Sequence, residues 1–236
     1  MQGVLLVDKP KGWTSFDVVN FVRKQVAAVE GKKPKNTKVG HTGTLDPLAT
    51  GLLVLLVGKE YTRRAPTLTK LDKTYEVTMK LGETSSTGDA EGVVTSIAHS
   101  VPSKKAIQDA LTAYEGKTMQ VPPAFSAMKV NGQRAYKLAR EGKAVELAPR
   151  PVTIYSNKLT GYHYPYVTFT SEVGSGTYIR SLVSDLGKHL GTGAYMSDLR
   201  RVRVGHFHIE QAVDKDRLNR ASLSELVCED VTDGIA

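Results

Sequence analysis

Apolar positions along the chain predict several strands. The unbroken run Leu52–Val57 is typical of a strand that is buried on both faces. Residues 74–81 alternate instead, with Tyr75, Val77, Met79 and Leu81 on one face, which predicts a half-buried strand. Two further strands are expected at 152–160 and 166–173.

Three helices follow from helical spacing and capping residues. Thr14 and Asp17 form a capping-box pattern before an apolar stripe of Val18, Val19, Val22 and Val26. Ser103 is expected to cap a second helix, whose buried face holds Ile107, Ala110, Leu111 and Tyr114. A third helix follows Gly174–Gly176, with Ile179, Leu182, Val183, Leu186 and Leu190 on its inner face.

The remaining segments are predicted to be loops and turns. Asn131 and Gly132 indicate a tight turn, and 82–92 is expected to be an open loop in which Asp89 and Glu91 face solvent. Strands and helices follow one another without regular βαβ alternation, so the sequence predicts an α+β fold.

Composition narrows the class of protein. The chain has 236 residues, 40% of them hydrophobic and 24% charged, which is ordinary for a soluble protein. A single cysteine excludes an intramolecular disulfide, and no apolar run is long enough to span a membrane. We therefore expect a cytoplasmic protein.

Charge favours a polyanionic partner. The formal net charge is +8, and four lysines (Lys32, Lys33, Lys35, Lys38) lie in one loop. These lysines are either solvated or bound to phosphates, as are the arginines at 200–203.

The segment Gly40–Gly51 contains one carboxylate, Asp46, among glycines and threonines and directly before the apolar run. Pro47 stiffens this turn, and the glycines would let a ligand approach the backbone closely. Asp46 is therefore either a nucleophile or simply a turn residue, as is common in Asp-Pro pairs.

This segment, GHTGTLDPLATG, resembles the catalytic motif of the TruB family of tRNA pseudouridine synthases. Five further segments match the family in order, from about residue 3 to about residue 210, and they are GVLLVDKPKGWTS from Gly3, KTYEV from Lys73, QVPPAFSAMK from Gln120, GTYIR from Gly176 and DLRR from Asp198. Phe125 departs from the tyrosine that family members often have there.

The resemblance implies the pseudouridine synthase fold, a mixed, mainly antiparallel sheet flanked by helices around a central active-site cleft. It implies a single catalytic domain over 1–236, with 211–236 as a C-terminal tail or helix and no room for the C-terminal PUA module of many members. It implies isomerisation of the T-loop uridine, position 55 of tRNA, after the base is flipped out of the T-arm. Neither a metal nor an organic cofactor is expected, and the enzyme is expected to act as a monomer without a protein partner.

The resemblance also implies roles for individual residues. Asp46 is the nucleophile, whether at C1′, through a glycal or at C6, and Arg180 keeps it ionised. The local pattern of Tyr75 favours a core tyrosine, but the resemblance implies a catalytic residue that stacks on the uracil or helps to remove the C5 proton. His41 holds the loop nucleotides open, and Tyr178 and Leu199 line the uracil pocket. The other cations contact RNA phosphates or form structural ion pairs, and they are Lys9, Lys129 and Arg201.

Two other functions are compatible with parts of the sequence. A noncatalytic RNA chaperone could share the fold and the basic charge. A nucleotide phosphate cradle could use the loop rich in glycine and threonine, but the loop lacks the lysine and hydroxyl that end a P-loop.

Overall fold

The computed structural model describes residues 1–97, 100–126, 128–130, 132–143, 145–220 and 223–228. The chain divides into two compact units, the first made of 1–75 and 200–236 and the second of 76–199. Two strands, β4 (Lys73–Leu81) and β12 (Ala194–Val204), continue from one unit into the other. Asn131 of the predicted turn and residues 229–236 of the predicted tail lie outside the described residues.

The first unit is built around β3. Strands β1 and β2 pair with β3 antiparallel, the Arg200–Arg201 part of β12 pairs with it in parallel, and β13 pairs with the end of β12. The elements of this unit, apart from β4 and β12, are β1 (Gly3–Lys9), α1 (Ser15–Val29), η1 (Pro34–Asn36), β2 (Val39–His41), β3 (Thr50–Val57), α2 (Lys59–Arg63), α3 (Ala65–Leu68), β13 (Phe207–His208), η2 (Ile209–Gln211), α7 (Lys215–Arg220) and α8 (Leu223–Leu226).

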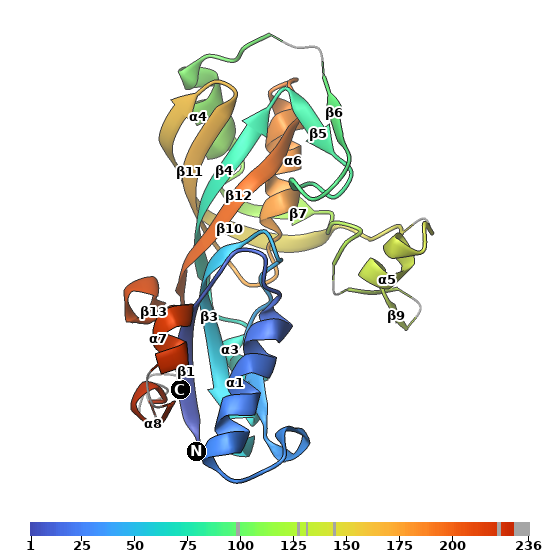
Figure 1. Ribbon diagram of the computed structural model, residues 1–236. Helices are drawn as coiled ribbons and strands as arrows, with labels where there is room; N and C mark the ends of the chain where they lie inside the picture. The colour runs from blue at the N-terminus through green and yellow to red at the C-terminus, as the bar shows by residue number, and fades with distance from the viewer. Residues whose placement is uncertain (98–99, 127, 131, 144, 221–222, 229–236) are drawn as a thin grey trace. The chain divides into compact units, whose positions relative to one another are not determined.

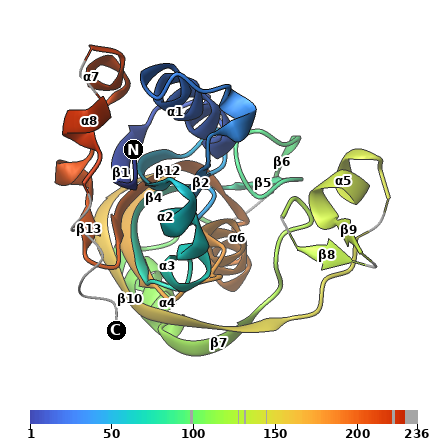
Figure 2. The same ribbon diagram turned by 90° about the horizontal axis from the view of Figure 1, so that it is seen from below.

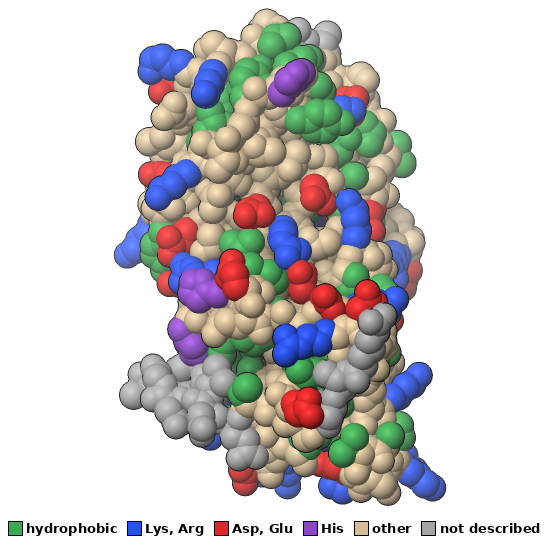
Figure 3. Space-filling model, turned by 60° about the vertical axis from the view of Figure 1, so that its left-hand side comes forward, with side chains coloured by type: hydrophobic (Ala, Val, Ile, Leu, Met, Phe, Trp, Pro, Cys, Tyr) green, Lys and Arg blue, Asp and Glu red, His purple; other side chains and the backbone are tan. Residues whose placement is uncertain are grey.

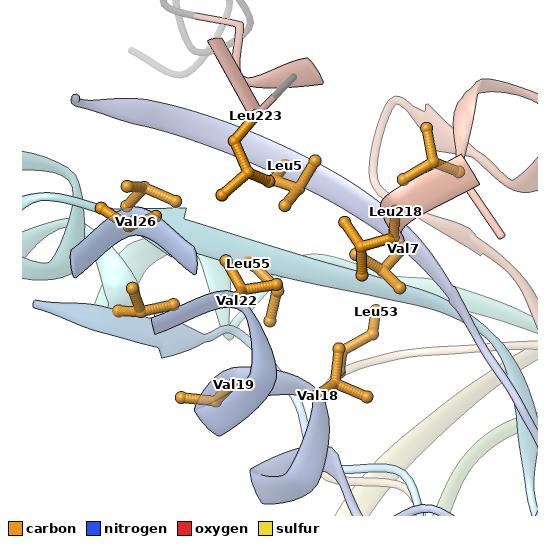
Figure 4. Packing of buried hydrophobic residues seen from close by; sticks show 13 residues of the cluster. Leu5, Val7, Val18, Val19, Val22, Val26, Leu53, Leu55, Leu218 and Leu223 are labelled. Carbon is orange, nitrogen blue, oxygen red and sulfur yellow. The ribbon is translucent and has the colours of Figure 1, made fainter. Parts of the chain in front are cut away.

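Strand β3 is apolar throughout because both of its faces are buried. Leu53, Leu55 and Val57 pack in a cluster with α1, while Leu52, Val54 and Leu56 pack on the opposite face in a second cluster. Figure 4 shows the first cluster, in which Val18 and Val22 of α1 lie beside Leu53 and Leu55 of β3. The predicted capping box is also confirmed, since Thr14 accepts from the Asp17 amide and Asp17 accepts from the Thr14 amide.

In the second unit the strand order is β12-β4-β11-β10-β7. Helix α4 packs against β10 and α6, and the α4 cap by Ser103 is confirmed. Figure 2 shows the short hairpin of β8 and β9 grouped with α5. The further elements of this unit are β5 (Glu83–Ser85), β6 (Val94–Ser96), α4 (Lys104–Ala113), β7 (Gly116–Gln120), β8 (Lys129–Val130), β9 (Gln133–Arg134), α5 (Ala135–Arg140), β10 (Arg150–His163), β11 (Tyr166–Val173) and α6 (Ile179–His189).

Candidate active site

The loop of residues 42–49, called the Asp46 loop below, joins β2 to β3 in the first unit. Asp46 is half-buried, and its carbonyl accepts from the Ala49 amide at 3.1 Å, which closes a turn. The preceding Leu45 is held by the first residue of α1. The buried Ser15 hydroxyl accepts from the Leu45 amide at 2.8 Å and donates to the Leu45 carbonyl at 3.0 Å. One hydroxyl therefore satisfies both backbone groups of the residue before Asp46.

The residue after Asp46 is held from the end of β1. The Pro47 carbonyl accepts from the Gly12 amide at 2.8 Å and from the Lys9 ammonium at 3.4 Å. Lys9 is fully buried, and its ammonium also donates to the carbonyls of Trp13, at 2.6 Å, and Pro10, at 3.0 Å. A buried charge is tolerated only where polar partners replace water, and these carbonyls do so.

Arg201 supports the beginning of the loop. Its guanidinium donates to the Gly43 carbonyl at 3.0 Å and to the Leu52 carbonyl at 2.7 Å, and the side chain is 2% exposed. Glycine is required opposite its backbone, because a Cβ on Gly51, whose φ is +101°, would lie 2.3 Å from the Arg201 carbonyl oxygen. The side chain and the backbone of Arg201 thus constrain both ends of the segment that contains Asp46.

These placements bear on the electrostatic prediction, which assigned Lys9 and Arg201 either to RNA phosphates or to structural ion pairs. Lys9 and Arg201 are interior supports of the loop, so their burial does not fit contact with an RNA backbone. Arg200 forms a two-pronged pair with Asp8, at 3.1 and 2.7 Å. The predicted basic face at 200–203 is therefore largely engaged within the protein, because guanidinium groups satisfy carbonyls and a carboxylate there.

His41 contributes a third support. Its Nδ1 accepts from the Gly43 amide at 3.2 Å, so in the neutral ring Nε2 carries the proton. Burial lowers the pKa of His41 below its ordinary value, and the Arg201 guanidinium lowers it further. Close by, burial and then Arg201 lower the pKa of Lys73 to about 8. Lys73 donates to the carbonyls of Thr69, at 2.8 Å, and Leu71.

Tyr75 lies on the buried face of β4 and is 8% exposed, as the alternating pattern predicts. Its stacking on a uracil stays a prediction.

In the second unit, Arg180 lies in the first turn of α6 and is 7% exposed. Its guanidinium donates to the carbonyls of Phe125, at 2.8 Å, and Thr87, at 3.2 Å, and lies 3.4 Å from the Asp89 carboxylate. Asp89 is 2% exposed and also accepts from the Thr87 hydroxyl at 2.6 Å. The prediction that Asp89 faces solvent was wrong, because the carboxylate turns inward to an arginine distant in sequence; Glu91 is exposed as predicted.

Tyr178 precedes α6 and is held by Gln120. The buried Gln120 amide accepts from the Tyr178 N–H at 2.8 Å and donates to the Tyr178 carbonyl at 3.1 Å. Ser181 adds a bond to the Val121 carbonyl at 2.7 Å. The start of α6 is thus fixed to the 120–125 segment, and a pocket of about 320 Å³ opens beside Arg180 between that segment and residues 86–88.

The structure groups the predicted residues by unit. Lys9, His41 and Arg201 lie around the Asp46 loop in the first unit. Tyr178 and Arg180 lie two residues apart at the start of α6 in the second unit. Leu199 is 7% exposed in β12, and Lys129 lies in β8. The pairing of Arg180 with Asp46, which belong to different units, stays a prediction, as does the central cleft.

Sequence reasoning missed the roles of Ser15, Gln120 and Asp89. Ser15 and Gln120 both lie in segments that resemble family signatures, and this position was the only indication in the sequence that they matter for the site.

Across the residues with described placement, no group of three or more histidine, cysteine or acidic side chains is arranged to hold a metal ion. Within the same residues no helix is both long and apolar enough to cross a membrane.

Comparison with known families decides the relationship. Residues 31–179 match the model of the TruB family pseudouridylate synthase N-terminal domain, and residues 180–230 match that of the tRNA pseudouridylate synthase B C-terminal domain. The chain belongs to the TruB family of pseudouridine synthases. The predicted membership and fold class are therefore confirmed.

Curated TruB relatives cover most of the chain, and each is named tRNA pseudouridine synthase B. The protein of Protochlamydia amoebophila (strain UWE25) is 42% identical over 91% of this chain and 78% of its own length. The protein of Aquifex aeolicus (strain VF5) is 43% identical over 90% of this chain and 72% of its own length. The protein of Clostridium novyi (strain NT) is 44% identical over 96% of this chain and 75% of its own length.

Solved structures agree with this assignment. A chain of a Cbf5-Nop10-Gar1 complex has a TM-score of 0.69 and 31% identity over 92% of this chain. A chain of an H/ACA RNP bound to a substrate RNA containing 2'-deoxyuridine has a TM-score of 0.65 and 29% identity. The present chain spans about half of each, 53% and 52%. The expectation of a monomer without protein partners stays a prediction.

Proposed function

We propose that this TruB-family protein isomerises the T-loop uridine at position 55 of tRNA to pseudouridine, with Asp46 as the nucleophile. Family membership supports the reaction, and the names of the curated relatives support tRNA as the substrate. The T-loop position rests on the resemblance of Gly40–Gly51 to the family's catalytic motif.

The reaction breaks the N1–C1′ bond of uridine, turns the base and joins C5 to C1′. The C5 proton is removed and N1 gains a proton, so atoms and oxidation state are conserved and the balance needs no redox partner. A carboxylate suits the nucleophilic step because it is ionised at neutral pH.

The observation that carries the proposal is that the backbone is held on both sides of Asp46. Ser15 binds both backbone groups of Leu45, and Lys9 and Gly12 bind the carbonyl of Pro47. A nucleophile held on both sides meets its target without reorganising, which is a large contribution to catalysis by positioning.

The roles proposed for the other residues rest on the resemblance to the family. The duplex-like T-arm hides the uridine, so the base must be flipped out before it reacts. We assign Tyr75 to stacking on the flipped uracil, Tyr178 and Leu199 to its pocket, and the neutral His41 to donating from Nε2 to the opened loop. Arg180 provides the cation that keeps the nucleophile ionised.

An unmodified tRNA transcript tests the proposal. The protein is incubated with the transcript and pseudouridine is mapped at single-nucleotide resolution, alongside a transcript with cytidine at position 55. We expect one pseudouridine, at position 55, and none in the cytidine transcript. Binding without any pseudouridine would favour the RNA chaperone, and modification at another uridine would refute the T-loop assignment.

A further inference from the structure

A second pocket lies in the first unit, at the end of α1 away from the Asp46 loop. It has a volume of about 360 Å³ and is called the lysine pocket below, because Lys32, Lys38 and Lys59 line it together with Glu30. Its lysines come from three segments, the loop after α1, the loop after η1 and the first turn of α2 (Figure 1).

The charge of the lysine pocket is positive. Lys32 pairs with Glu30 at 3.0 Å, which leaves Glu30 engaged. Lys38 and Lys59 are exposed, and neither forms an ion pair with an acidic side chain in the part of the chain that the structure describes. Three lysines and one glutamate give the lining side chains a net charge of +2.

The rim extends this positive region. Lys33 and Lys35 are both exposed in the segment between Lys32 and Lys38. Figure 3 shows a face on which basic and acidic side chains are interspersed. A run of lysines with one engaged glutamate differs from that mixture and suits a chain of phosphates better than a single anion.

The lengths of α1 and β3 show how far the pocket lies from the Asp46 loop. Helix α1 begins at Ser15, which binds Leu45, and ends beside Glu30; its 15 residues span ~22 Å at about 1.5 Å per residue. Strand β3 begins after the loop and ends before Gly58; its 8 residues span ~26 Å at about 3.3 Å per residue. Both routes place the pocket more than ~20 Å from Asp46.

We propose that the lysine pocket binds backbone phosphates of the substrate RNA at a distance from the reacting nucleotide. The proposal rests on the proposed function for the identity of the RNA. Phosphate contacts at such a distance fix the orientation of the RNA and add affinity without reading its sequence. At more than ~20 Å from Asp46, a contact in the lysine pocket requires RNA beyond the T loop, which whole tRNA supplies and which a T-loop hairpin with a short stem lacks.

The test compares a double variant, Lys38→Gln with Lys59→Gln, with a matched control, Lys104→Gln with Lys158→Gln. The control lysines are also exposed, without an ion pair among the described residues, and lie in the second unit. Binding of unmodified tRNA, and of a T-loop hairpin with the shortest stem that folds, is measured over a series of salt concentrations. The Asp46→Asn background prevents turnover during binding, and pseudouridine formation is measured separately without it.

We expect the pocket variant to bind tRNA several-fold more weakly and its log–log salt slope to fall by about two, one for each lost phosphate contact. Hairpin binding and the rate at saturating tRNA should be unchanged. An unchanged tRNA affinity, an equal effect in the control, or an equal effect on the hairpin would each refute RNA binding by the lysine pocket. The proposed function would still stand if the protein formed pseudouridine. If the parent protein forms no pseudouridine in tRNA, the proposed function is refuted, and the proposal for the lysine pocket is refuted with it.

Discussion

Removing the Ser15 hydroxyl should loosen the Asp46 loop without changing its sequence. In Ser15→Ala, the amide and carbonyl of Leu45 lose partners at 2.8 and 3.0 Å, in a region where Ser15 is 2% and Leu45 3% exposed. Each unsatisfied buried group costs about 1–3 kcal/mol, and with partial relaxation we expect a loss of about 2–4 kcal/mol in unfolding free energy. A chain of this size would then melt roughly 5–15 °C lower.

The effect on rate should exceed the effect on binding. Misplacing a nucleophile by about 1 Å costs on the order of a hundredfold, so the single-turnover rate at saturating tRNA should fall by at least about tenfold. Ser103→Ala is the control, because it removes a helix-capping hydroxyl in the second unit and costs about 1 kcal/mol of stability. A Ser15→Ala rate within twofold of the parent, despite a lower melting temperature, would refute fixation of the loop by Ser15.

Three other substitutions test the remaining supports. Arg180→Lys keeps the cation but loses the fork that binds two carbonyls and Asp89, so the single-turnover rate should fall at least about tenfold while tRNA affinity changes little; a rate within about twofold, roughly 0.4 kcal/mol, would contradict this. Gln120→Leu removes both bonds to the Tyr178 backbone, so the KM for tRNA should rise and kcat fall, whereas an unchanged kcat/KM would show that Tyr178 needs no such support. Because the pKa of Lys73 is lowered to about 8 from 10.5, the folded state binds fewer protons than the unfolded chain and stability rises with pH. The unfolding free energy of the parent, relative to Lys73→Met, should therefore gain on the order of 1 kcal/mol between about pH 7 and 9, and a difference that does not vary with pH would contradict the burial of that charge.

Local structure was readable from the sequence because it depends on neighbouring residues. The capping box at Thr14 and Asp17 lies within one turn of chain, and the apolar run of β3 records burial on both faces. The alternation in β4 likewise predicted the buried position of Tyr75.

Long-range partners of charged side chains were not readable in this way. Asp89 looked like a surface residue in a polar loop, but Arg180, 91 residues later in the sequence, pairs with it. For Lys9 and Arg201 the sequence left RNA phosphates and structural ion pairs both open, because their actual partners are backbone carbonyls, which leave no mark in the pattern of side chains. Recognition of Asp46 itself came from the resemblance, since an Asp-Pro turn alone favours no chemistry.

Release of the C5 hydrogen is the most direct test of Asp46 as the nucleophile. A tRNA transcript labelled with tritium at C5 of uridine is incubated with excess protein, and released tritium is counted for the parent, Asp46→Asn and Asp109→Asn. Asp109→Asn is the matched control, because it removes an exposed carboxylate from α4. The account predicts near-complete loss of release for Asp46→Asn with tRNA binding retained, and release at the parent rate for Asp109→Asn. Release by Asp46→Asn at a few per cent of the parent rate or more would contradict the assignment of Asp46 as the nucleophile.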